Sequence, residues 1–167
     1  MIIGAGEVLF DGQGQGGRRI ADITGFFKSV EAKDITQTLG YFAVDAEFSD
    51  PHYPKLNMRG QAEIRNGLLW GFKTMKQFGF HIRAFYPSHD NSGVAVSVDA
   101  RHILPNGRLL HFQQVFVFRF EGEKIRSLAV YAQYRPNGLL GLVLFFQHRV
   151  HHLLMRLYVS ADNNPPG

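Results

Sequence analysis

The sequence predicts an α+β fold, in which three N-terminal helices pack against a strongly curved antiparallel sheet to form a cone-shaped α+β barrel. In the first half of the chain, apolar residues recur at spacings of three and four, as on one face of a helix. The second half contains long segments rich in β-branched and aromatic residues, separated by turn sequences. The 167 residues and 45% hydrophobic content suit one domain with a hydrophobic core.

Three helices are predicted in the first half of the chain. The first covers Ile20–Val30, and Asp34 is placed to cap a short second helix. The third runs from Gly60 to Phe78. Gly67 and Gly71 weaken this third helix, and they indicate either close packing or an opening beneath it.

One strand is predicted before the third helix, at residues 44–50, and a meander of strands follows that helix. The meander has strong turn signals, such as Asp90-Asn91-Ser92-Gly93 and Pro105-Asn106-Gly107. Its strands are Phe80–Ser88, Val94–Leu104, Arg108–Phe120 and Lys124–Gln133.

The chain divides into a flexible glycine-rich segment at 1–17, a folded domain at 18–136 and an extra C-terminal helix at 137–160. The first segment matches G-x-G-x-x-G, but no convincing buried strand precedes the match, so we expect no dinucleotide site there. The C-terminal helix is apolar at its start and basic further on. This pattern predicts a lid over the site or a subunit interface, with a membrane-facing role as the alternative.

Composition argues against several classes of function. Lys and Arg are scattered although the net charge is +4, so no nucleic-acid partner is expected. The absence of cysteine excludes disulfides and thiolate metal sites. His148, His151 and His152 have a spacing that zinc can use, but Arg149 beside them favours a basic helical face, and we expect no metal. The N-terminus lacks a secretory signal and no apolar run reaches about 18 residues, which predicts a cytoplasmic protein.

The pair Asp50-Pro51 at the end of the first strand is the most informative short motif. Proline disfavours helical backbone for Asp50, so the carboxylate lies on an extended residue at the strand end. A carboxylate at the mouth of an apolar pocket is a common general base. The alternative is an ordinary Asp-Pro turn.

Several further landmarks follow in a fixed order along the chain. They are Asp34, Phe42, Phe48-Ser-Asp50-Pro51, Arg59-Gly60, Glu63-Ile64-Arg65, Phe118-Arg-Phe-Glu-Gly122, Lys124-Ile125 and Tyr131-Ala-Gln-Tyr-Arg-Pro136. Together they resemble the SnoaL-like or nuclear-transport-factor-two-like superfamily, which includes ketosteroid isomerase, limonene epoxide hydrolase and polyketide cyclases. The resemblance covers about residues 20–144. It implies a cofactor-free protein that forms a homodimer through the outer face of its sheet.

The resemblance to ketosteroid isomerase assigns a role to Asp50, which matches the proton-shuttling aspartate of that enzyme. The two acidic donors that hold the enolate oxygen there correspond to Phe26 and Phe116 in this chain. Neither phenylalanine can donate a hydrogen bond, so a steroid isomerase of that type is not expected.

The resemblance to limonene epoxide hydrolase places Asp99 where that enzyme keeps its acid. The flanking arginine and second aspartate of that enzyme correspond to Ser97 and Val130 here, with Arg101 as a substitute on the face of Asp99. If Asp99 faces the cavity, strand alternation puts His102 on the outer face.

The expected site is apolar with a few convergent polar groups, as is usual for small-molecule sites. His52 and Tyr53 are expected at its mouth and Trp70 on its helical wall. Asp50 and Asp99 are the predicted catalytic residues, and the predicted substrate contacts are Arg101, Gln114, Tyr53, Trp70, Phe26, Phe112, Phe116 and Val130. The outer sheet face, with His102, His111, Gln113, Val115 and Tyr131, is the expected dimer surface.

These residues favour a cofactor-independent acid/base enzyme of the isomerase or cyclase type. Its substrate would be a small hydrophobic cyclic molecule, such as a polyketide, a terpenoid or a steroid-like compound. One alternative is an epoxide hydrolase in which Asp50 and Asp99 together hold a water molecule. The other is a non-catalytic domain that binds a small ligand or a protein partner.

Overall fold

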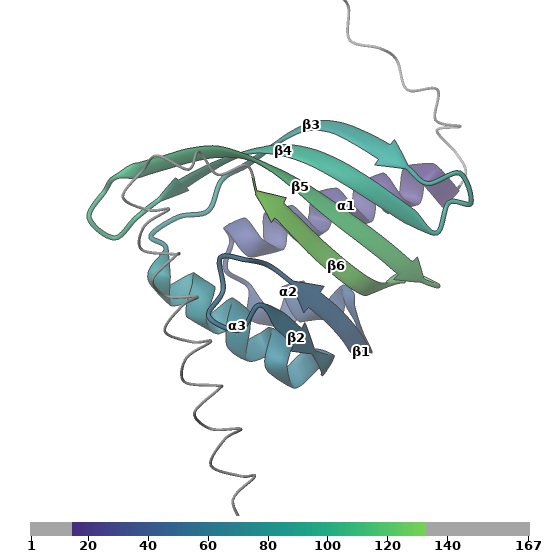
Figure 1. Cartoon of the computed structure of the whole chain (residues 1–167), viewed down its shortest axis with the longest axis horizontal. Coiled ribbons are helices and arrows are strands. Elements are labelled where there is room, and N and C mark those ends of the chain that lie inside the picture. The colour runs from purple at the N-terminus through teal and green to yellow at the C-terminus, as the bar shows by residue number, and fades with distance from the viewer. Residues whose placement is uncertain (1–14, 133–167) are drawn as a thin grey trace, which may run out of the picture. The chain divides into compact units, whose positions relative to one another are not determined.

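A computed structural model describes residues 15–132 as three helices and a six-stranded sheet (Figure 1). The helices are α1 (Gln15–Glu31), α2 (Ile35–Gly40) and α3 (Gly60–Thr74). The strands are β1 (Phe42–Ser49), β2 (Asn57–Arg59), β3 (Phe80–Pro87), β4 (Gly93–Ile103), β5 (Leu109–Glu121) and β6 (Lys124–Ala132). The predicted α+β class is confirmed. The predictions for residues 1–14 and for the C-terminal helix at 137–160 lie outside the described residues.

The sheet is mixed, so the prediction of a wholly antiparallel sheet is wrong. Its strand order is β2-β1-β6-β5-β4-β3, and β1 runs parallel to β6. A parallel pair needs a long connection between its strands. Here α3 and the strands β3 to β5 lie between β1 and β6 in the chain, and they supply that connection. The short strand β2, which pairs with the end of β1, was not predicted.

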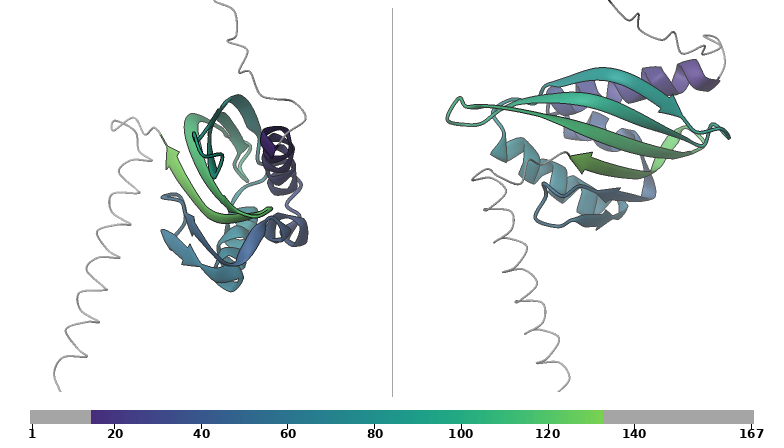
Figure 2. Two further views of the ribbon diagram at one scale, coloured as in Figure 1. Left: turned by 90° about the vertical axis from the view of Figure 1, so that its right-hand side faces the viewer. Right: turned by 45° about the horizontal axis from the view of Figure 1, so that its top comes forward.

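The sheet curves around the helices, and its curvature has local causes (Figure 2). The pairing register shifts between Ile82 and Ala84 on β3, between Arg119 and Phe120 on β5, and between Phe42 and Glu47 on β1. Such bulges bend a strand and increase its twist. The bent sheet turns one of its faces toward the helices (Figure 2).

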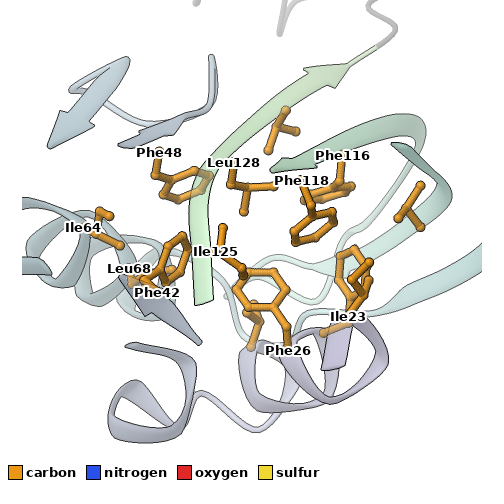
Figure 3. Packing of buried hydrophobic residues seen from close by; sticks show 14 of the residues in the cluster. Ile23, Phe26, Phe42, Phe48, Ile64, Leu68, Phe116, Phe118, Ile125 and Leu128 are labelled. Carbon is orange, nitrogen blue, oxygen red and sulfur yellow. The ribbon is translucent and has the colours of Figure 1, made fainter. Parts of the chain in front are cut away.

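We call this helix-covered side of the sheet the inner face. On β4 and β5 it carries even-numbered residues, from Val94 to His102 and from Leu110 to Phe120, because alternate side chains point to opposite faces. Figure 3 shows how this face meets the helices, with Phe26 of α1 directed toward Phe118 of β5. The core contains Ile23, Phe26, Phe42, Phe48, Ile64, Leu68, Phe116, Phe118, Ile125 and Leu128.

Helix α3 ends at Thr74, earlier than the predicted end at Phe78. Met75 has extended backbone angles, and the next residues pair with the end of β4 through Gln77 and Ile103. Phe78 therefore joins the core from an extended segment, so the apolar spacing that placed it on the helix was misleading. The glycine prediction is confirmed as close packing, because a Cβ at Gly71 would lie 2.9 Å from the Tyr53 hydroxyl.

Lys33 links the turn after α1 to the C-terminus of α3. Its ammonium group donates hydrogen bonds to the carbonyl oxygens of Phe72 at 2.9 Å and Met75 at 2.6 Å. The last carbonyls of a helix have no partner within the helix, and a cation there also interacts favourably with the negative end of the helix dipole. Lys33 thus holds α3 against the end of α1.

We expect Lys33→Met to lower the free energy of unfolding by about 1–3 kcal/mol, because it removes two charge-assisted hydrogen bonds. Urea unfolding monitored by circular dichroism measures this change. Lys28→Met is the matched control, since Lys28 is an exposed lysine in the last turn of α1 and should change stability by less than about 0.5 kcal/mol. Equal stabilities of the two variants would contradict this role of Lys33.

Candidate active site

Asp50 begins a tight turn directly after β1. The Tyr53 amide donates to the Asp50 carbonyl oxygen at 3.2 Å, and the His52 amide donates to Asp50 Oδ1 at 2.9 Å. Proline suits the second position of such a turn, and aspartate suits the first because its side chain accepts from the backbone two residues on. The interpretation of Asp50-Pro51 as a turn is therefore confirmed. It does not exclude a chemical role for the carboxylate.

The Asp50 carboxylate continues the inward-facing row of β1 that begins with Ala46 and Phe48. Asp50 is 6% exposed, and its Oδ1 lies 2.5 Å from Nδ1 of His52. An ionised carboxylate only accepts hydrogen bonds, so His52 Nδ1 is the donor in this contact. Both contacts fall on Oδ1, and among residues 15–132 no donor occupies Oδ2. Asp50 is thus a buried carboxylate with one oxygen fixed and the other unoccupied by these residues.

His102 lies on the inner face of β4 and is 5% exposed. Its ring centroid is 5.1 Å from both Phe78 and Phe80 and 5.7 Å from Phe112. The other edge of this aromatic group meets His52, whose ring is 5.4 Å from Phe112. The Phe112 ring therefore contacts both imidazoles, which come from segments far apart in the sequence.

The surroundings of His102 favour its neutral form. Burial, and then the charge of His52, lower the pKa of His102 to about 4, and Asp50 opposes this shift. Burial and the negative charge of Asp50 raise the pKa of Tyr53, so its phenol stays protonated. Both shifts connect Asp50 electrostatically to side chains of the same region.

Gln114 of β5 adds a further polar group to the inner face, two residues from Phe112. It is 4% exposed, and its Oε1 has no hydrogen-bond partner among the described residues. Buried polar atoms are usually paired, so an orphan acceptor on the same strand face as Phe112 is a feature of a binding site. A ligand with a hydrogen-bond donor would satisfy it.

Asp99 and Arg101 do not join Asp50, and the prediction that Asp99 faces the cavity is wrong. Asp99 pairs with Gln113 across the sheet, whereas Val98 pairs with Gln114, and residues directly opposite each other share a face. Asp99 therefore lies on the outer face, where its Oδ2 is 3.4 Å from Arg83 of β3. Arg101 is exposed on that same outer face. We therefore interpret Asp99 as one half of a structural ion pair with Arg83.

The same error placed His102 on the outer face and left it out of the site. Strand alternation has a period of two, so a shift by one residue exchanges the two faces. The signal was present in the sequence, because Val94, Val96 and Val98 form a regular apolar row that marks the buried face. His102 continues that row. The contact between Asp50 and His52 follows from the turn, which the sequence also indicated.

The remaining predicted substrate contacts fall into two groups. Phe26, Phe116 and Val130 belong to the core, where Phe26 contacts Phe118 at 5.6 Å and Phe116 contacts Phe27 at 4.9 Å between ring centroids. The ring centroids of Tyr53 and Trp70 are 5.8 Å apart, and Trp70 is 40% exposed. Contact of any of these side chains with a substrate stays a prediction.

Within residues 15–132 there is no cluster of three His, Cys, Asp or Glu side chains that could hold a metal ion. In the same part of the chain, no helix is both long and apolar enough to cross a membrane. On the outer face, Val115 and Tyr131 are exposed, and dimerisation through this face stays a prediction.

The comparisons with known proteins agree with this fold. The model of the SnoaL-like domain family matches residues 23–128, and the chain belongs to this family. No curated protein matches the chain.

Solved structures with the same fold include enzymes and proteins of unknown function. The Δ5-3-ketosteroid isomerase from Mycobacterium sp. is similar at a TM-score of 0.61 and 21% identity, over 68% of this chain and 92% of that one. The epoxide hydrolase/cyclase-like enzyme SalBIII, with a role in pyran ring formation in polyether salinomycin, gives 0.63 and 21%, over 71% and 93%. An NTF2-like protein of unknown function from Burkholderia pseudomallei gives 0.62 and 16%, over 70% and 91%. At these identities the similarity establishes the fold.

The lowered pKa of His102 predicts a loss of stability in acid. Since the pKa is about 4 in the folded chain and about 6.5 when unfolded, the unfolded state takes up the proton first as the pH falls. The contribution of His102 to the free energy of unfolding is fully present above pH 6.5. It decreases by about 3 kcal/mol in all as the pH falls from 6.5 to about 4. Urea unfolding at several pH values measures it.

In this experiment His102→Phe should remove that part of the pH dependence, because phenylalanine does not titrate. His111→Phe, at an exposed position of β5, should keep the wild-type dependence. A His102→Phe variant with the full wild-type dependence between pH 7 and 4 would show that His102 titrates normally.

Proposed function

We propose that this protein is a cofactor-independent acid/base enzyme that moves a proton within a small hydrophobic cyclic substrate, as isomerases and cyclases do. One observation carries the proposal: the Asp50 carboxylate is 6% exposed, is held through Oδ1 by His52, and has no partner on Oδ2 within residues 15–132. A base needs a fixed position and an unoccupied lone pair, and Asp50 has both.

The proposed step is proton abstraction next to a carbonyl group. Asp50 Oδ2 takes the proton from the carbon, the C–H electron pair forms a new C=C bond, and the carbonyl π pair moves to the oxygen. In an isomerisation, the substrate carries a further C=C bond conjugated with the enolate; the oxygen pair re-forms the carbonyl, the enolate C=C bond shifts to conjugate with it, and the π pair of the further C=C bond takes the proton back from Asp50 at the γ-carbon. In a cyclisation, the enolate carbon instead attacks a second carbonyl carbon of the same molecule, the π pair of that carbonyl moves to its oxygen, and Asp50 passes the proton to this alkoxide. His52 keeps Asp50 in place through its Nδ1–H during both halves of the reaction.

The apolar surroundings of Asp50 support a hydrophobic substrate. Phe112 contacts His52, and Phe48 contacts Tyr53 at 5.5 Å between ring centroids. Exclusion of water from such surroundings strengthens the interactions of a charged intermediate with nearby dipoles. Membership of the SnoaL-like family supports the same class of chemistry.

The epoxide-hydrolase alternative loses its proposed mechanism, because Asp50 and Asp99 lie on opposite faces of the sheet and cannot hold one water molecule. Incorporation of ¹⁸O from labelled water into the diol product of an epoxide substrate would support that alternative. A non-catalytic domain remains the competing description, and the following experiment separates it from an enzyme.

We expect the full-length protein to catalyse exchange of α-protons for deuterium in hydrophobic cyclic enones and lactones, followed by proton NMR in D₂O. Exchange reports proton abstraction even when no net product forms. Asp50→Asn should lower the exchange rate by about 10²-fold or more, because it removes the base.

Asp45→Asn is the matched control, since it makes the same chemical change at an exposed residue of β1 whose ion pair with Arg126 contributes little to stability. It should exchange at the wild-type rate. Binding of these compounds without any exchange would support the non-catalytic description. Exchange by Asp50→Asn at the wild-type rate would exclude Asp50 as the base.

A further inference from the structure

We propose that His102 is a second functional group of this site, and that its Nε2–H donates a hydrogen bond to the substrate oxygen on which charge develops. This inference rests on the proposed function, since that oxygen is the carbonyl oxygen of the enolate that Asp50 generates. Its role would be catalytic because it touches the reacting group.

The position of His102 near His52 and Asp50 supports this role. His102 and His52 contact the same ring, Phe112, with centroid distances of 5.7 and 5.4 Å. His52 in turn holds the Asp50 carboxylate. A planar substrate near Phe112 could therefore have Asp50 on one side of its reacting atoms and His102 on the other. Base and oxygen donor must meet the substrate at separate atoms, and this arrangement provides that separation.

A backbone hydrogen bond determines which ring nitrogen of His102 carries the proton. The Gly79 amide donates to Nδ1 of His102 at 3.3 Å, so a neutral ring carries its own proton on Nε2. Among residues 15–132 no acceptor takes this Nε2–H. Gly79 can make this contact because its backbone approaches β4 closely: a Cβ there would lie 2.6 Å from the carbonyl oxygen of Arg101. The contact with the Gly79 backbone thus leaves Nε2 as the donor of the ring.

The oxygen of the proposed enolate needs a hydrogen-bond donor. The two donor positions known from ketosteroid isomerase correspond to Phe26 and Phe116, and both rings pack in the core. An enolate on the inner face therefore requires a donor from elsewhere. A neutral imidazole in an apolar setting can act as such a donor. His52 and Asp50 are the titratable groups that influence His102, and burial together with His52 favours its neutral state.

The orphan Oε1 of Gln114 points to a ligand independently of His102. It is a buried acceptor two residues from Phe112 on the same face. A substrate that also carries a hydroxyl or N–H group would satisfy it. The substrate class is thereby narrowed to an apolar ring system with a carbonyl oxygen and a separate hydrogen-bond donor.

Imidazole NMR of the ¹⁵N-histidine-labelled full chain tests the proton position directly. We expect His102 to remain neutral with its proton on Nε2 from pH 7.5 to pH 5. We use 2-naphthol as the probe, because its aromatic hydroxyl oxygen resembles an enol oxygen. On binding, the Nε2 proton of His102 should shift downfield. A proton on Nδ1, or an Nε2 proton that saturating bound 2-naphthol leaves unchanged, would overturn the proposal.

Substitutions give a second readout in the exchange assay. His102→Phe keeps an aromatic ring among Phe78, Phe80 and Phe112 but has no donor, and it should lower kcat for exchange by about 10²-fold with a smaller change in KM. His102→Gln retains an N–H donor and should recover part of this loss. Circular dichroism and thermal unfolding establish that both variants are folded. Wild-type kcat in a folded His102→Phe would overturn the role of His102.

The two proposals fail in distinguishable ways. If Asp50→Asn loses exchange while a folded His102→Phe keeps it, only the role of His102 is wrong. If the wild-type chain exchanges none of the compounds, the proposed function is wrong, and the inference that rests on it falls with it. In that case the NMR experiment still decides whether His102 Nε2–H binds a ligand oxygen.

Discussion

The pairing of β4 with β5 is the constraint on which the rest of this structure depends. Their register runs from Gly93 opposite Arg119 to Ile103 opposite Leu109, and it fixes which side chains meet the helices. Val94, Val96 and Val98 then pack with Phe116 and Phe118 in one core. The same alternation, continued along β4, brings His102 to the inner face and sends Asp99 to the outer face. One register thus determines both the hydrophobic core and the polar groups beside it.

The second element of the site is a turn that forms through local contacts. The Asp50–Tyr53 turn uses the backbone of four consecutive residues, and its side-chain contact joins residues two positions apart. Such a turn needs no long-range packing to orient the carboxylate. Long-range structure contributes the surroundings, since Tyr53 packs beneath Gly71 of α3 and Phe112 comes from β5. A rigid short turn within an aromatic setting is a suitable support for a base, because it limits reorganisation during the reaction.

Much of the fold could be predicted from local patterns, because helix periodicity, capping by Asp34 and turn sequences such as Asn106-Gly107 act within a few residues. The turn at Asp50-Pro51 could be predicted for the same reason. The parallel pairing of β1 with β6 could not be predicted in this way, since it joins segments separated by most of the domain. The end of α3 differs from the prediction because Phe78 keeps the helical spacing, whereas the neighbouring Gln77 pairs with Ile103 of β4. The inward orientation of His102 differs from the prediction, although the row of valines on β4 marks the buried face.

A crystal structure of the full chain with 2-naphthol bound would show whether Asp50, His52 and His102 form one site on the inner face. We expect the aromatic ring of the ligand to lie against Phe112, with its oxygen at hydrogen-bond distance from His102 Nε2. Asp50 should lie on the opposite side of the ligand from His102. A ligand bound instead beside Asp99 and Arg83 on the outer face, or an inner face closed by side chains at saturating ligand, would contradict it.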